Sequence, residues 1–420
     1  MPTSRRAFLV SALAASAFPA RGADDLAPFD KLFDGFLETH RVPGAAVAVT
    51  RGGKLVYARG FGRANVEKKL PVRADTRFRI ASVSKPLTGV AVMMLAEQKK
   101  FALDDTVLKH IALKPFAHKD AKPDPRWAEV TIRQCLQHTG GWDRDRTGGF
   151  DPIGIPGRIT DQMKLAGPPT PDDVVRYMMG ARLDFDPGTK AVYSNLGYLV
   201  LGRVIEAVTG AKYEPWVKKN VLAPLGITGM ALGRALPQNR TASEASYYDA
   251  RPDSRGRCLY PPKVGELVPW PDGGMNVEGF EAHGGWVASA VDLVRFASAF
   301  DYGTKSPLLS AGSITEMWTR PKGAAGTEAD GKPRAAYLGC GWMVRPVGNT
   351  GRANTWHTGL IAGTSALLVR RSDGLNWAVL FNTDANPDDK RPADLIDPLM
   401  HEAANTVKAW PAGDPFPKVK

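Results

Sequence analysis

The strand patterns of this chain lie near its two ends, and a long stretch of turns and short helical patterns separates them. Residues 45–50 and 55–59 have the composition of two strands joined through a pair of glycines, which predicts an antiparallel hairpin. Residues 366–369 and 377–382 form a second such pattern around a Ser-Asp-Gly turn. Because we find no linker composition between them, the late strands are expected to complete the sheet that the early ones begin.

Helical periodicity fills the rest of the chain. The middle, from about residue 102 to 271, is rich in Pro and Gly between short helical patterns, and we interpret it as an inserted, mostly helical subdomain. The predicted fold class is therefore mixed α/β: an antiparallel sheet flanked by helices, within one catalytic domain spanning residues 24–420. Helices are expected at about 29–37, 82–98, 172–179, 198–208 and 394–407.

Composition excludes several classes of protein. The formal net charge is +12, yet Lys and Arg are scattered and are not interleaved with stacking aromatic residues, so nucleic-acid binding is disfavoured. Three cysteines, Cys135, Cys258 and Cys340, allow at most one disulfide, which excludes a disulfide scaffold. We also find no internal repeat with a period of 20 to 50 residues.

The first 23 residues have the pattern of an export signal. Arg5 and Arg6 precede an uncharged run from Ala7 to Ala20, and the segment Ser4 to Leu9 resembles the twin-arginine motif. The uncharged run is shorter than the about 20 residues that span a bilayer, and no later stretch is apolar enough to do so. We therefore expect a periplasmic or secreted protein without a membrane span.

A Ser-x-x-Lys motif, Ser82 to Lys85, opens the helix predicted at 82–98. Residues at i and i+3 share a helix face, so the amine of Lys85 can reach the hydroxyl of Ser82. The N-terminus of the helix would also direct N–H groups toward negative charge on an attacked carbonyl. Taken alone, the motif is more typical of a helix-capping Ser followed by a solvated Lys.

Two further motifs carry polar groups suited to catalysis. Tyr193-Ser194-Asn195 can present a phenol and an amide together, although a loop whose Ser194 or Asn195 caps the next helix has the same pattern. His357-Thr358-Gly359 stands just before the late strands, where Gly359 would let a carbonyl substrate approach the backbone. A second His-Thr-Gly begins at His138, but it is more typical of a helix end and turn, so we assign the site to the later copy.

The order and flanks of these motifs carry a family resemblance. From about Pro43 to Asp384 the chain closely resembles the serine β-lactamase and penicillin-binding superfamily, nearest its class C-like branch, which also holds carboxylesterases of the family VIII type and D-aminopeptidases. The motifs that carry the resemblance, in chain order, are Phe78 to Pro86, the His138 segment, Asp186-Pro187-Gly188-Thr189, Tyr193 to Tyr198, Gly284-Gly285-Trp286 and His357-Thr358-Gly359.

The resemblance implies a β-lactamase/transpeptidase-like fold and a role for each matched residue. Ser82 would be the nucleophile, Lys85 its proton acceptor and Tyr193 a partner in proton transfer. Asn195 would orient the substrate amide or the lysine, and His357, Thr358, Gly359 and Leu360 would contact the substrate. The N–H groups of Ser82 and Leu360 would form the oxyanion hole. Neither a metal nor an organic cofactor is expected, and Lys85 must lose its charge through burial to serve as a base.

One departure from the family pattern guides the choice of substrate. Lactamases and carboxypeptidases of the superfamily usually carry Lys where this chain has His357, and a neutral imidazole binds a substrate carboxylate more weakly. The sequence therefore predicts an exported serine hydrolase that prefers esters or small amides to antibiotics. The alternatives are a catalytically silent protein that binds penicillin or cell-wall peptides, and a D-amino-acid peptidase or carboxypeptidase.

Overall fold

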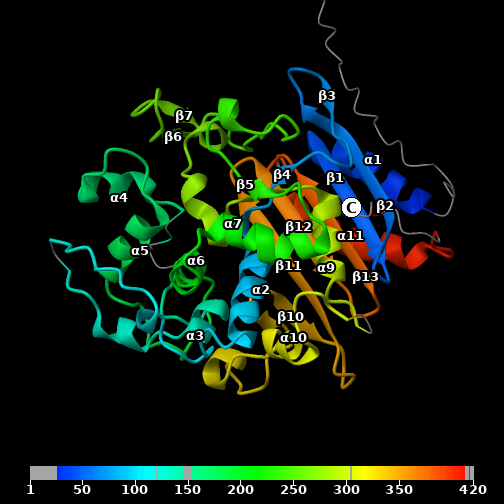
Figure 1. Ribbon diagram of the computed structural model, residues 1–420. Coiled ribbons are helices and arrows are strands. Elements are labelled where there is room, and N and C mark those ends of the chain that lie inside the picture. The colour runs from blue at the N-terminus through cyan, green and yellow to red at the C-terminus, as the bar shows by residue number, and fades with distance from the viewer. Residues whose placement is uncertain are drawn as a thin grey trace, which may run out of the picture.

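A large antiparallel sheet with helices on both faces forms the centre of the computed structural model (Figure 1). Within the described residues its strand order is β3-β2-β1-β13-β12-β11-β10-β9. The strands are β1 (Gly44–Arg51), β2 (Lys54–Asn65), β3 (Leu70–Pro71), β9 (Tyr337–Leu338), β10 (Met343–Pro346), β11 (Ala353–Ile361), β12 (Thr364–Arg370) and β13 (Leu375–Phe381). The structure describes residues 26–119, 121–144, 151, 153–302, 305–411 and 416, so the export signal expected at residues 1–23 lies outside them.

Strands from opposite ends of the chain pair in the middle of the sheet, as the sequence predicts. Both expected hairpins are present, β1 with β2 and β12 with β13. The N-terminal β1 pairs with the C-terminal β13 from Ala45 opposite Phe381 to Arg51 opposite Leu375. The mixed α/β fold class with an antiparallel sheet is thereby confirmed.

Side chains of the central strands alternate between two apolar layers. Val47 and Val49 of β1 pack toward α1 (Ala27–His40) and α11 (Pro392–Thr406), which cover one face of the sheet. Ala46 and Ala48 face the opposite layer, where α9 (Ala290–Ser298) lies against β1 and β13. Because both faces are covered, these strands are continuous apolar runs in the sequence rather than alternating ones.

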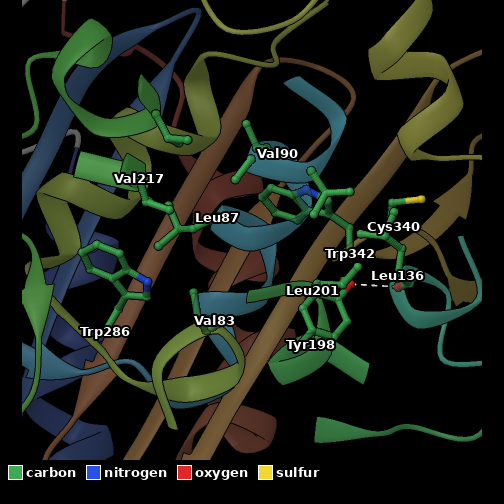
Figure 2. Close-up of a cluster of buried hydrophobic side chains, with 14 of the residues drawn as sticks. Val83, Leu87, Val90, Leu136, Tyr198, Leu201, Val217, Trp286, Cys340 and Trp342 are labelled. Atoms are coloured by element: carbon green, nitrogen blue, oxygen red, sulfur yellow. Dashed lines mark hydrogen bonds between the residues drawn. The ribbon is translucent and has the colours of Figure 1, made fainter. Parts of the chain in front are cut away.

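Helix α2 is the central element of the helical half and is buried on almost every side. Figure 2 shows Leu87 and Val90 of this helix packed among Tyr198, Trp286 and Trp342 from three distant segments. The helices on this side are α2 (Ser84–Glu97), α3 (Ile132–Leu136), α4 (Pro156–Met163), α5 (Pro171–Met179), α6 (Asn195–Thr209), α7 (Tyr213–Val217), α8 (Glu281–Gly284) and α10 (Ala311–Met317). Small strands join them: β4 (Phe78–Arg79), β5 (Ala231–Leu232), β6 (Arg255–Arg257), β7 (Leu267–Pro269) and β8 (Trp286–Ala288).

Strand β11 brings the sheet to the start of α2. It pairs with β10 only from Ala353 to Trp356, which leaves the later part of this edge to the 3₁₀ turn Ala81–Val83. His357 does precede the two predicted late strands, which are β12 and β13, but it lies within β11, a strand that the sequence analysis did not predict. The polar composition of this strand, which faces the turn, concealed its periodicity.

Two further findings concern the chain as a whole. Cys135, Cys258 and Cys340 are all buried and none of them forms a disulfide. In the part of the chain that the structure describes, no helix is both long enough and apolar enough to cross a membrane.

Candidate active site

Ser82 lies in the short turn that leads into α2, and Lys85 lies on the first turn of that helix. The Lys85 Nζ is 3.1 Å from the Ser82 Oγ, the contact that the i, i+3 spacing predicts. Ala81, just before Ser82, has a φ of +45°, a left-handed conformation that non-glycine residues adopt at an energetic cost. Ser82 is half-buried, whereas Lys85 is fully buried and therefore differs from the solvated lysine of the capping alternative.

The amine of Lys85 has two other oxygen neighbours. Asn195 Oδ1 lies 2.7 Å from the Nζ, and the main-chain carbonyl oxygen of His283 lies 2.8 Å from it. Burial lowers the pKa of Lys85 well below its usual value, Asp151 opposes this shift and Arg144 adds to it. A lysine in this position can hold an uncharged amine, which a solvated lysine near neutral pH does not.

The local sequence around Asn195 fixes its amide. Ser194 caps α6 by accepting the N–H of Gly197, so Asn195 begins that helix with its side chain buried. The Asn195 Nδ2 donates to both carboxylate oxygens of Asp151, at 3.1 and 2.8 Å. Ser194 therefore caps the helix, as one interpretation of the motif expects, and Asn195 also lies beside Lys85, as the other interpretation expects. Sequence reasoning missed Asp151, which no motif includes.

Tyr193 packs against the amine and against a histidine that the sequence did not assign to the site. Its ring centroid is 4.7 Å from Lys85 Nζ and 4.5 Å from the ring of His138, on which it stacks. His138 stands in the turn after α3, as expected, and its Nδ1 accepts the N–H of Ser194 at 2.9 Å. Burial raises the pKa of the Tyr193 phenol, which the neighbouring Ser82 hydroxyl opposes, and no described group is within hydrogen-bonding geometry of its Oη.

His357 enters the same cluster from the sheet. Its ring is buried 6.1 Å from that of Tyr193, and its Nδ1 lies 2.6 Å from the carbonyl oxygen of Thr358. Since a carbonyl can only accept, Nδ1 carries the proton and Nε2, which has no partner among the described groups, is a bare acceptor. Burial lowers the pKa of His357 to about 3, and Lys85 adds to the effect. The imidazole is neutral near pH 7.

The residues after His357 line the open edge of β11. A Cβ on Gly359 would meet the carbonyl oxygen of Ile80 at 2.2 Å, so the glycine permits close contact with the turn that carries Ser82. The sequence analysis expected a substrate carbonyl to approach Gly359. In the structure the main-chain carbonyl of Ile80 occupies that position. Ile361 and Thr364 flank a two-residue turn and lie opposite each other as the last pair of the two strands. Successive main-chain N–H groups of an antiparallel strand point to opposite edges of that strand. The N–H of Leu360 therefore points away from β12.

Comparison with known proteins identifies the family of this chain. The family model described as Beta-lactamase matches residues 29–399. The chain belongs to the beta-lactamase family. Esterase EstB of Burkholderia gladioli is 29% identical over 395 residues, which cover 88% of this chain and 93% of that protein. Protein flp of Staphylococcus aureus strain N315 is 29% identical over 227 residues, and the match spans 54% of this chain but only 42% of flp.

Solved structures share the fold of this beta-lactamase-family chain. The octameric penicillin-binding protein homologue from Pyrococcus abyssi has a TM-score of 0.62 at 25% identity, covering 90% of this chain and 78% of that one. EstCE1, described as a hydrolase with promiscuous acyltransferase activity, has a TM-score of 0.66 at 23% identity, covering 92% of this chain and 99% of that one. The likeness to EstCE1 concerns the fold alone.

The structure brings together five of the residues that the sequence singled out: Ser82, Lys85, Tyr193, Asn195 and His357. Thr358, Gly359 and Leu360 follow on the strand beside them. Among the described residues, no cluster of three or more His, Cys, Asp or Glu side chains is arranged to hold a metal ion. The groups placed to act on a substrate here are a hydroxyl, an amine, a phenol and main-chain amides.

Proposed function

We propose that this chain is an exported serine hydrolase that cleaves ester or small amide bonds through an acyl-enzyme on Ser82. The observation that carries the proposal is the set of three oxygen atoms around the buried Lys85 amine. A neutral amine has two hydrogens and one lone pair. The two carbonyl oxygens, from Asn195 and His283, can only accept, so they take both hydrogens. The lone pair is then left for the hydroxyl of Ser82.

This arrangement supports Lys85 as the base for acylation. The Ser82 Oγ bonds to the substrate carbonyl carbon while its proton passes to the Lys85 Nζ, which becomes an ammonium. The N–H groups of Ser82 and Leu360 stabilise the negative charge on the carbonyl oxygen. The bond to the leaving group then breaks while that group takes back a proton from the lysine side, so it leaves as an alcohol or an amine. Water afterwards hydrolyses the acyl-enzyme by the same proton route.

The phenol of Tyr193 suits the opposite role. Because burial raises its pKa, the phenol stays protonated in the working range and can donate rather than accept a proton. Its Oη has no hydrogen-bond partner in the described structure and lies near Ser82, where the leaving group departs. We therefore assign Tyr193 to proton delivery to the leaving group, with Lys85 restoring its proton.

An ester preference rests on His357. A buried imidazole with a pKa of about 3 carries no charge for the carboxylate of a penicillin or of a peptide C-terminus. The similarity to an esterase over 88% of this chain supports the same choice. We rank short esters first, small amides second, and β-lactams and D-alanyl peptides last.

The test combines a covalent label with a substrate panel. A fluorophosphonate probe followed by mass spectrometry should modify Ser82 in the wild-type chain, and a Ser82→Ala variant should stay unmodified. p-Nitrophenyl acetate, a chromogenic cephalosporin and a D-alanyl peptide then rank the activities. Failure of every acylating probe to label Ser82, with intact binding of peptidoglycan fragments, would instead identify a silent binding protein. A D-alanyl peptide hydrolysed best would identify a D-peptidase.

Export is the second part of the proposal and depends on residues 1–23 alone. Replacing Arg5 and Arg6 by Lys keeps the charge but removes the twin-arginine pair. We expect the doubly substituted chain to stay in the cytoplasm and the unsubstituted chain to reach the periplasm or medium. Equal distribution of both proteins between these fractions would contradict a twin-arginine signal.

A further inference from the structure

A cavity of about 390 Å³ lies beside the strand end that follows His357. Leu360 and Ile361 form part of its wall, and Met275 lines it from a distant loop. Met275 and Ile361 belong to the same buried cluster as Ala81, the residue next to Ser82. The cavity therefore lies beside Leu360, whose N–H group is the proposed oxyanion donor, and its apolar wall continues into the cluster that holds the neighbour of Ser82.

Most of the cavity wall is apolar, but Asp249 contributes a carboxylate and Arg251 a guanidinium. Its side chain is only 6% exposed. The Oδ1 accepts the main-chain N–H of Arg251 at 2.9 Å, whereas the Oδ2 is buried and has no hydrogen-bond partner among the described groups. Burying a carboxylate oxygen without a hydrogen bond lowers the stability of the fold. Its presence beside an apolar cavity therefore indicates a ligand that donates the missing hydrogen bond.

The neighbouring charges leave this corner negative. The Arg251 guanidinium is 72% exposed and lies 3.9 Å from Asp249 and 3.7 Å from Asp384, too far for a hydrogen bond to either. Asp384 accepts the N–H groups of Ala250 and Gly363, which ties the Asp249 loop to the β11–β12 turn. The carboxylates of Asp249 and Asp384 thus share one guanidinium, and it forms a hydrogen bond with neither.

We propose that this cavity receives the acyl group of the substrate, and that Asp249 selects acyl groups in which an apolar stem ends in a positively charged amine. The proposal rests on the acyl-enzyme function proposed for Ser82. The apolar wall buries the stem, and the unpartnered Asp249 oxygen accepts a hydrogen bond from the ammonium. To make room, Arg251 moves aside, which its exposure and its long contacts permit.

Two p-nitrophenyl esters with the same acyl chain length test this selectivity. The 6-aminohexanoate ester carries the ammonium and the hexanoate ester lacks it, so the ratio of their kcat/KM values measures recognition of the charge. Asp249→Asn should lower this ratio by about tenfold or more, because only the 6-aminohexanoate ester loses a charged partner. Asp253→Asn, an exposed change on the same loop, should leave the ratio unaltered.

A second measurement uses the wild-type chain, so it does not depend on the folding of a variant. Hexylammonium should inhibit p-nitrophenyl acetate hydrolysis at a concentration about tenfold lower than hexan-1-ol does. Equal inhibition by both, or an unchanged ester ratio in a folded Asp249→Asn protein, would overturn the role of Asp249. Ser82-dependent acetate hydrolysis in that case would leave the proposed function standing, whereas loss of Ser82 labelling by every probe would overturn both proposals.

Discussion

Asn195 Oδ1 lies 2.7 Å from Lys85 Nζ, and the far end of the same amide determines this orientation. The Asn195 Nδ2 donates to both oxygens of Asp151, so the carbonyl rather than the NH₂ group faces the lysine. Asp151 therefore acts on Lys85 in two ways. It orients the acceptor that takes one lysine hydrogen, and its charge favours the ammonium form.

Asp151→Asn separates these two effects, because an amide at residue 151 can still accept from Asn195 but carries no charge. Only a neutral Lys85 accepts a proton, so kcat/KM falls as the pH drops through the lysine pKa. Asp151 raises that pKa, and its neutralisation should move the acid limb of the pH profile to lower pH. The profile for p-nitrophenyl acetate measures the shift. Asp161→Asn on the exposed face of α4 is the control, and a limb displaced to higher pH would contradict the assignment.

Lys85→Arg tests whether residue 85 must be uncharged. A guanidinium stays protonated at every working pH, so the variant keeps a cation but lacks a base. We expect kcat for ester hydrolysis to fall by about 10³-fold, within the range for loss of a general base. Lys100→Arg, exposed beyond the end of α2, should have wild-type activity. Activity within about tenfold of the wild type in the folded variant would mean that Lys85 is not the base.

Local patterns explain the part of the fold that could be predicted from the sequence. The two hairpins and helix α2 depend on turn residues and on short-range periodicity, which a single sequence displays. The contact between Ser82 and Lys85 belongs to the same class, because residues three apart on a helix share a face. Strand β11 was not predicted because its burial alternates but its residue types do not: the buried positions include Thr355, His357 and Gly359, and one of the positions between them is Trp356.

Contacts between remote segments explain what the sequence could not supply. The third neighbour of Lys85 is the main-chain carbonyl of His283, 198 residues away, and any residue type provides such an oxygen. Asp151 and His138 reach the site through tertiary packing against Asn195 and Tyr193. A pattern search can register a side-chain type, but it has no signal for a carbonyl group or for a stacking partner.

His357→Lys tests the reason for the ester preference. A lysine at this position would offer a cation to the carboxylate of a β-lactam, while burial beside Lys85 would favour its neutral form and keep the gain modest. We expect the second-order rate constant for acylation by benzylpenicillin to rise about tenfold, equivalent to about 1.4 kcal/mol. His401→Lys on α11, 39% exposed, should have no such effect. An unchanged acylation rate would show that the residue at this position does not set the preference.

Gly359→Ala tests whether contact between strand β11 and the turn before Ser82 holds the site together. The new Cβ would lie 2.2 Å from the Ile80 carbonyl oxygen, so strand and turn must separate. We expect a loss of about 2 kcal/mol in the free energy of unfolding by urea, as for other overpacked sites. Because small displacements of reacting groups are costly, kcat for p-nitrophenyl acetate should also fall by about 10²-fold. Gly35→Ala in α1 has open space and should instead stabilise the protein by about 0.5–1 kcal/mol. A Gly359→Ala protein with wild-type kcat would mean that Ser82 is positioned independently of the sheet.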